Sequence, residues 1–208
     1  METVASAIAM NALPCLKVLD LRSSELVRSM MMGLATGGSP LLERLTVIVS
    51  EYDEIPGVVA ALEQRSLHEA CTPLCEFKFH QYIEDDALLN RLFACRILAS
   101  VDNFSLGGHG RAGMKAFVMY LEEGLKQGQP RGVKRFNAEF FCQNPDGNAE
   151  LLMDVLARGG APNLEKLGGL CEGERDGVYW SPQAKWLFNN KVAGQKGACP
   201  RLTCRVPW

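Results

Sequence analysis

Residues 152–167 read Leu-Met-Asp-Val-Leu-Ala-Arg-Gly-Gly-Ala-Pro-Asn-Leu-Glu-Lys-Leu, and this segment says most about the fold. Its first half spaces apolar residues three and four apart, which is typical of an amphipathic helix. Gly159 stands where the C-terminal cap of a helix belongs, and Pro162 stops the helix from continuing. Leu164 and Leu167 then turn a corner into a short strand. The segment therefore predicts a helix, a tight turn and a strand in succession.

The same phrase recurs along the whole chain, at steps of 24 to 38 residues. The first apolar residue of each copy is one of Leu16, Leu42, Leu74, Leu98, Val133, Leu164 and Leu202. Six copies have a proline just ahead of the strand, namely Pro14, Pro40, Pro73, Pro130, Pro162 and Pro200. The fourth copy has no proline and is read as Leu98, Val101, Asn103 and Leu106. One strand and one helix cannot bury their apolar faces alone, so the repeat predicts stacked units with a continuous core.

The clearest unit begins at Asn103 and continues through Leu106-Gly107 and Gly110 into a helical run over residues 114–125. This unit resembles the leucine-rich repeats of the ribonuclease-inhibitor type. The resemblance implies an α/β solenoid, a horseshoe with parallel strands on its concave face and helices on its convex face. It covers residues 1–208 as a single domain of six to seven irregular repeats, although residues 171–199 fit the pattern poorly. The role that it implies is protein–protein binding.

The residues that alternate with the inward leucines would point to the concave face. They are Asp20, Arg22, Arg44, Thr46, Glu76, Lys78, His80, Asp102, Arg135, Asn137, Glu139 and Lys166. Together they form ladders of mixed charge, which suit a protein partner of complementary charge. We therefore expect a scaffold without catalytic activity that binds a protein on this face. The identity of that partner is not encoded in the pattern.

The composition argues against several other classes of protein. A formal net charge of -2 and a pI near 6.0 offer no basic excess for nucleic acid. No run of about 18 apolar residues predicts a membrane span, and Glu2 is the only charge in the first ten residues, unlike a signal peptide. The 8 cysteines contain no Cys-x-x-Cys pair, so reduced thiols are expected in place of a metal site or disulfides. These features predict a cytoplasmic protein without metal or cofactor.

Two motifs invite a catalytic interpretation. Gly108 to Gly113 has the glycine spacing of a phosphate-binding loop, but Met114 comes before Lys115 and the hydroxyl residue is missing. His68 and Cys71 are three residues apart on a predicted helix, so a hydrolase with a thiol–imidazole pair stays open.

Two roles without catalysis also stay open beside the general scaffold. They are a regulator of a small GTPase, a class that includes proteins with this repeat type, and a substrate receptor of a ubiquitin ligase. The characteristic loop of the first and the adaptor-binding segment of the second are not visible in the sequence.

Several local features carry predictions of their own. Asp85 is expected near the start of a helix, and Ser181-Pro182 is expected to begin another. Met30, Met31 and Met32 are predicted to fill the core from a helix, and Trp186 is predicted to pack inward, as are the apolar residues that line each helix. Both ends of the chain are apolar and lack a polar cap, so either a longer array or self-association through the ends is expected.

Overall fold

Strands and helices alternate along the chain, and each pair of neighbouring strands is parallel wherever the pairing is described. The computed structural model describes residues 7–8, 10, 12–22, 24–49, 51–81, 83, 85–107, 110–138, 148–168, 182–193 and 196–202. The chain divides into two compact units, Met1–Val101 and Asp102–Trp208. The predicted α/β class with parallel strands is therefore confirmed.

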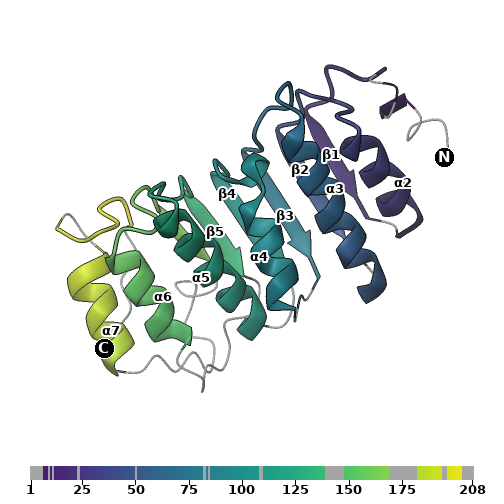
Figure 1. The fold of residues 1–208 in the computed structure, drawn as a ribbon. Coiled ribbons are helices and arrows are strands. Elements are labelled where there is room, and N and C mark those ends of the chain that lie inside the picture. The colour runs from purple at the N-terminus through teal and green to yellow at the C-terminus, as the bar shows by residue number, and fades with distance from the viewer. Residues whose placement is uncertain are drawn as a thin grey trace. The chain divides into compact units, whose positions relative to one another are not determined.

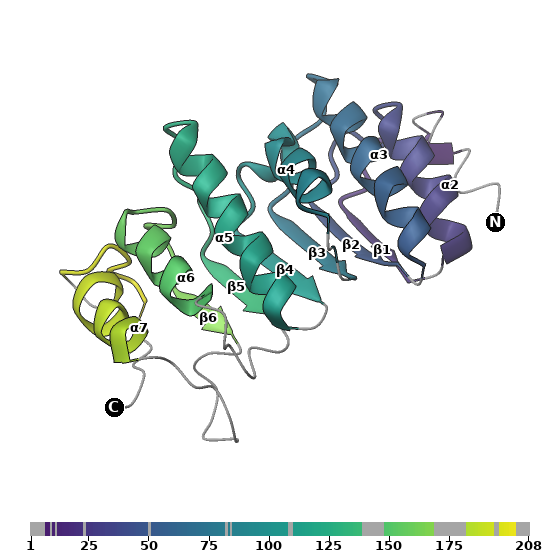
Figure 2. The same cartoon turned by 60° about the horizontal axis from the view of Figure 1, so that its bottom comes forward.

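The first unit contains three described strands, three α-helices and two 3-10 turns. They are β1 (Val18–Leu21), α2 (Ser24–Ala35), β2 (Arg44–Ile48), η1 (Tyr52–Glu54), α3 (Ile55–Leu67), β3 (Glu76–His80), α4 (Asp86–Ala94) and η2 (Arg96–Leu98). Strand β2 pairs with β1 and β3, and the register aligns Leu19, Leu45 and Phe77 in one row. The helices of this unit all cover the same face of its sheet (Figures 1 and 2).

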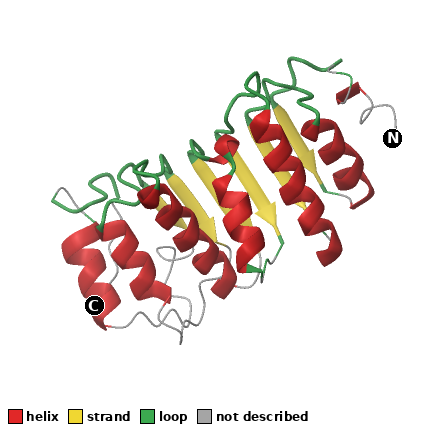
Figure 3. Ribbon diagram, viewed as in Figure 1, coloured by secondary structure: helices red, strands yellow, loops and turns green. Residues whose placement is uncertain are grey.

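The second unit repeats this arrangement. Its elements are β4 (Asn103–Gly107), α5 (Gly110–Lys126), β5 (Arg135–Ala138), α6 (Asn148–Ala157), β6 (Lys166–Gly168), α7 (Pro182–Leu187) and the π-helical turn η3 (Phe188–Val192). The register aligns Phe104, Phe136 and Leu167 in one row. Figure 3 shows the alternation of strand and helix in each unit. The predicted helix start at Pro182 is confirmed.

A recurring hydrogen-bond pattern marks the entry to the strands. The N–H of the first apolar residue donates to the carbonyl three residues earlier, from Leu16 to Leu13, Leu42 to Ser39, Val101 to Leu98, Leu164 to Ala161, and Leu202 to Cys199. One carbonyl of the preceding copy then accepts two successive N–H groups. Lys17 accepts from Glu43 and Arg44, for example, and Asp102 accepts from Lys134 and Arg135. Most of the copies found in the sequence therefore share these contacts, whereas the N–H of Leu74 in the third copy donates to the Ile97 carbonyl instead.

The frame predicted for the fourth copy is wrong by three residues. Val101, not Leu98, has the hydrogen bond of a first apolar residue, and Leu98 lies in η2. Phe104 pairs with Phe136 and is fully buried, while Asn103 lies opposite Arg135 and is only half-buried. With Val101 as the first residue, the steps on either side of this copy become 27 and 32 residues. The corrected frame makes the repeat more regular, and it places Asp102 just ahead of β4.

Glycine ends three of the helices in the same way. Gly37, Gly128 and Gly159 have φ values of +82°, +66° and +86°, a conformation that L side chains rarely adopt. In each case the glycine N–H and the next N–H donate back to carbonyls of the last helical turn. This is the C-terminal cap that the sequence predicted at Gly159. The start of α4 also agrees with prediction, because the Asp85 carboxylate accepts the N–H groups of Ala87 and Leu88.

Some side chains predicted to be buried are exposed instead. Leu67 and Leu151 lie at the ends of their helices, and Met32 and Trp186 are 68% and 48% exposed. Each lies next to a buried stripe but outside its width, because a helix turns by about 100° per residue. The ammonium of Lys191 lies 5.9 Å from the centre of the Trp186 ring. The predicted use as core residues is therefore wrong for Met32 and Trp186, whereas Met30 and Met31 are buried as predicted.

Candidate functional site

The helices leave one face of the sheet uncovered in each unit (Figure 2). On β2 and β3, accessible polar residues alternate with buried apolar ones. In β2, Leu45 and Val47 are buried while Arg44 and Thr46 remain accessible. In β3, Phe77 and Phe79 are buried between accessible polar residues in the same way. The alternation predicted for these strands is therefore confirmed.

The register of the first unit brings its outward side chains into rows. Asp20, Thr46 and Lys78 form one row across β1, β2 and β3, and Arg44 lies opposite Glu76 in another. Two ion pairs link residues along single strands or just beyond their ends. Lys78 Nζ lies 2.6 Å from Glu76 Oε1, and Arg22 Nη2 lies 2.8 Å from Asp20 Oδ2. This face therefore holds both signs of charge within a few ångströms.

The ionisation of Asp20 responds to its surroundings on this face. Arg22 donates from Nε to both carboxylate oxygens at 3.1 Å, and this hydrogen bonding lowers the pKa of Asp20. Burial opposes the effect, and the positive charges of Lys78 and His80 add to the lowering. The carboxylate of Asp20 therefore stays ionised at lower pH than an ordinary aspartate does.

We predict that Arg22→Ala raises the pKa of Asp20 towards its ordinary value, because the largest stabiliser of the carboxylate is removed. A depressed carboxyl pKa stabilises the folded chain above the unfolded value of about 3.9, and the contribution is lost as pH falls through the folded pKa. Carboxyl ¹³C NMR titration of the two proteins measures the shift. An unchanged Asp20 pKa would show that the Arg22 contact is not formed in solution.

The second unit brings cationic side chains together on its uncovered face. Arg135 lies opposite Asn103 on one side and Lys166 on the other, and both cations are exposed. Like charges directly opposite each other on neighbouring strands destabilise a sheet. Ahead of the strands, Lys134 Nζ lies 2.8 Å from Asp102 Oδ2, so the predicted Asp102 is engaged beside the face, outside any strand. Asn137 is described by its backbone in β5 alone, and Glu139 lies outside the described residues.

The structure adds outward residues that the sequence frame missed. Asn103 and Ser105 occupy the positions of β4 that alternate with the buried Phe104, opposite Arg135 and Asn137, but Ser105 is itself buried, so only Asn103 joins the accessible face. Ile48 is the outward residue at the end of β2, opposite His80. The hydrogen bond from Val101 to Leu98 shows that the fourth copy begins at Val101, and this frame gives the positions of Asn103 and Ser105. The apolar spacing in the sequence fits a start at Leu98 equally well.

The cysteine chemistry of the described residues is that of packed thiols. Burial raises the pKa of Cys95 to about 11 and that of Cys199 to about 12. Cys71 is buried with its Sγ 3.8 Å from the Gly37 carbonyl, while His68 Nε2 lies 3.0 Å from the Ala35 carbonyl. No hydrogen bond links the Cys71 thiol to the His68 ring among these residues. No cluster of three or more potential metal ligands occurs in the same part of the chain.

Alkylation of the native chain at pH 8 should therefore discriminate between its thiols. We expect iodoacetamide to modify the exposed Cys15 and to leave Cys95 and Cys199 unmodified, because their buried thiols resist forming the thiolate that reacts. Peptide mapping by mass spectrometry measures the modified fraction at each position. Rapid labelling of Cys199 in the folded chain would contradict this account, and labelling of all three in denaturant provides the control.

No helix in the described segments is both long and apolar enough to span a bilayer. Comparisons with protein-family models, with curated proteins and with solved structures gave no match, so the site rests on the geometry of the chain itself.

Proposed function

We propose that this chain is a leucine-rich-repeat scaffold of the ribonuclease-inhibitor type, which binds a protein partner on the uncovered faces of its sheets. The observation that carries the proposal is the alternation in β2 and β3. Apolar side chains point into the core at one position, and charged or polar side chains stand outward at the next. Five outward positions, Arg44, Thr46, Glu76, Lys78 and His80, form one accessible surface. A rigid sheet that displays such a surface is suited to hold a partner by complementary charge.

The second unit suggests the chemistry of the partner segment that would lie on it. Arg135 and Lys166 are exposed, adjacent and of the same charge. An acidic segment would form charge-assisted hydrogen bonds with these exposed cations. The corresponding surface of the first unit has mixed charge, so its partner segment carries both signs. The proposal places the binding function on the outward strand positions, and a cytoplasmic protein complex is the setting it implies.

Photo-crosslinking from the sheet face tests this proposal directly. We expect a crosslinking residue at Thr46 to capture a discrete protein in cell extract, and the Lys78→Glu change to reduce its yield about fivefold or more. A crosslinker at Asn90, an exposed residue of α4, is the matched control and should not capture the same protein. Capture from Asn90 alone, or a yield from Thr46 that Lys78→Glu does not alter, would place the interaction elsewhere.

A further inference from the structure

One row of outward side chains in the second unit consists of two cations and an amide. Asn103, Arg135 and Lys166 lie side by side as the first residues of β4, β5 and β6. The side chains of Arg135 and Lys166 are exposed, and that of Asn103 is half-buried. Neighbouring strands lie about 4.8 Å apart, so one small anion can contact more than one of these side chains. The row therefore presents a compact positive surface.

Two acids lie just ahead of the strands that carry this row, and each is matched by a cation of its own. Asp102 precedes β4, and its Oδ2 lies 2.8 Å from Lys134 Nζ. Glu165 precedes β6, and its Oε1 lies 3.6 Å from Arg201 Nη1. Each pair is neutral in sum. The two acids therefore add no net negative charge beside the row.

The equivalent row of the first unit has a different charge. Val18, Arg44 and Glu76 are the first residues of β1, β2 and β3. Arg44 and Arg135 hold the same place in their repeats, two residues after the first apolar residue of the copy. Arg44 lies opposite an acid, whereas Arg135 lies opposite Lys166. Of these two described rows, the one in the second unit is suited to an anion.

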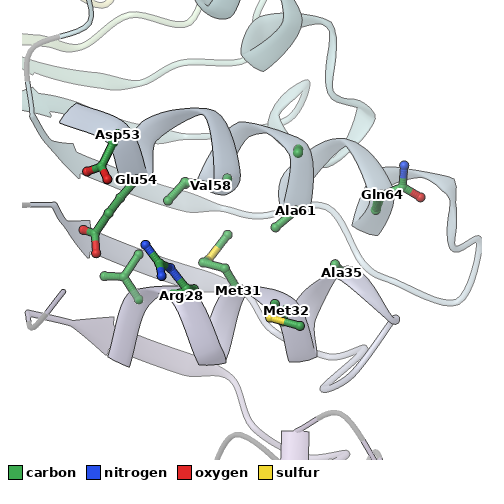
Figure 4. A pocket seen from close by; sticks show the side chains of 12 residues that line it. Arg28, Met31, Met32, Ala35, Asp53, Glu54, Val58, Ala61 and Gln64 are labelled. Atoms are coloured by element: carbon green, nitrogen blue, oxygen red, sulfur yellow. The ribbon is translucent and has the colours of Figure 1, made fainter. Parts of the chain in front are cut away.

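A groove between α2 and α3, on the helical side of the first unit, also holds a cation (Figure 4). Met32 lines it, and so does Gly57, where an added Cβ would meet nothing within 4 Å. Arg28 lies at one end of the groove together with Asp53 and Glu54 (Figure 4). Two acids beside one arginine repel an anion. The groove is therefore unsuited to a negatively charged ligand, in contrast to the row in the second unit.

We propose that the row of Asn103, Arg135 and Lys166 binds a phosphorylated serine or threonine in a segment of the protein partner. The inference rests on the proposed scaffold function, and it identifies the acidic group that the segment carries. The Arg135 guanidinium donates two parallel hydrogen bonds to phosphate oxygens. The Lys166 ammonium donates to the phosphate from one side, and the Asn103 amide adds a neutral donor from the other.

The charge of the row matches a phosphate better than a carboxylate. A phosphorylated side chain carries a charge of about -1.5 to -2 near pH 7 and has three acceptor oxygens. A carboxylate carries one charge and has two oxygens. Two cations therefore balance a phosphate, and they exceed the charge of a single carboxylate. A protein segment is favoured over a membrane or nucleic acid, because the formal net charge of the chain is -2 and provides no general basic excess.

The probe is a peptide of about nine residues, made of glycine, alanine and serine, with phosphoserine at its centre. Two matched peptides carry glutamate or unmodified serine at the same position. Calorimetric titration of the full-length protein measures the affinities. The Nε–H NMR signal of Arg135, identified by its loss in Arg135→Gln, reports where the peptide binds. We expect this signal to shift, the phosphopeptide to bind about tenfold more tightly than the glutamate peptide, and the serine peptide not to bind.

Variants of the chain separate a specific contact from general attraction between charges. Arg135→Gln should weaken binding of the phosphopeptide about tenfold, and Lys166→Gln about fivefold. Arg135→Lys keeps the charge but loses the planar fork, so an intermediate loss is expected. Arg44→Gln is the matched control, because it removes the same charge from the equivalent position of the first unit, and it should change affinity less than about twofold. Circular dichroism melting verifies that each variant is folded.

Three results would overturn the phosphate site. They are equal affinities for the phosphopeptide and the glutamate peptide, equal losses from Arg135→Gln and Arg44→Gln, and binding of inorganic phosphate as tight as that of the phosphopeptide. Vesicles of phosphatidylcholine and phosphatidic acid provide one more arm. Binding to them that Arg135→Gln abolishes, without binding of the phosphopeptide, would also overturn the site, because the ligand would then be a membrane.

The crosslinking experiment at Thr46 uses neither Arg135 nor Lys166, so the two proposals can be tested separately. Capture of a protein from Thr46 without binding of the phosphopeptide would overturn the phosphate site and leave the scaffold function standing. Phosphopeptide binding that depends on Arg135, without any capture from Thr46, would uphold the phosphate site and contradict the wider scaffold function.

Discussion

Replacing Arg65 with alanine is expected to lower the free energy of unfolding by about 3–5 kcal/mol. This side chain is fully buried, and its two terminal nitrogens donate to the carbonyls of Gly38 at 2.7 Å and Ser39 at 2.9 Å. Those carbonyls belong to the turn that leads from α2 into β2. Alanine would leave both without donors and would create a cavity where a long side chain had packed.

A denaturant titration of the free energy of unfolding measures this effect, with two controls. Arg91→Ala removes a half-exposed arginine that pairs with Glu63 at 2.7 Å, and it should cost at most about 1 kcal/mol. Arg65→Lys keeps a charge but cannot reach two carbonyls with a planar fork, so an intermediate loss is expected. A loss below about 1 kcal/mol for Arg65→Ala would show that the turn does not depend on this residue.

The burial of Arg65 could not have been predicted from the sequence. Its place in the linear pattern is that of an ordinary charged residue near the end of an amphipathic helix. Charged side chains are seldom fully buried unless partners satisfy them. The partners of Arg65 are backbone carbonyls 26 and 27 residues away, which no local pattern reveals.

The features that the sequence did predict are local. Glycine and proline at the helix ends act through the conformation of their own backbone, so the cap at Gly159 could be placed without knowledge of the fold. The alternation in β2 and β3 depends on neighbours two residues apart, and it placed Arg44 and Lys78 on the accessible face. Predictions of this kind succeed because the physical cause lies within a few residues.

The predicted frame of the fourth copy was wrong for an identifiable reason. Leu98, Val101 and Phe104 are each three residues apart, so two frames fit the apolar spacing equally well. The copy also lacks the proline that anchors the other frames, because Ala99 occupies its place. The pairing of Phe104 with Phe136 and the turn from Leu98 to Val101 decide between the frames, and both depend on tertiary contacts. The outward positions of β4 could therefore not be assigned from the sequence.

The groove between α2 and α3 left one trace in the sequence, which was Gly57. A glycine within a helical run has a cost, so its presence asks for a reason in packing or function. Met32 was instead predicted to lie in the core, since methionine is a common core residue. Only its position just outside the buried stripe of α2 shows that it borders open space.

The corrected frame of the fourth copy predicts a large difference in stability between two variants, because it places Phe104 in the core and the adjacent Asn103 on the outward face. Phe104→Ala should lower the free energy of unfolding by about 3–5 kcal/mol. The Phe104 ring is fully buried and stacks on Tyr120 with ring centres 4.7 Å apart and an interplanar angle of 4°. Its loss would leave a cavity between β4 and α5 and remove the stacking partner of a buried aromatic residue.

Asn103→Ala is the matched comparison, since this residue is half-buried on the outward face and should cost less than about 1 kcal/mol. Chemical denaturation of both variants measures the two values on one scale. The frame with Asn103 at an inward position predicts the reverse, with a large loss at position 103 and a small one at position 104. The ratio of the two losses therefore decides which residues of β4 point outward, and with it whether Asn103 belongs to the face that we propose binds a partner.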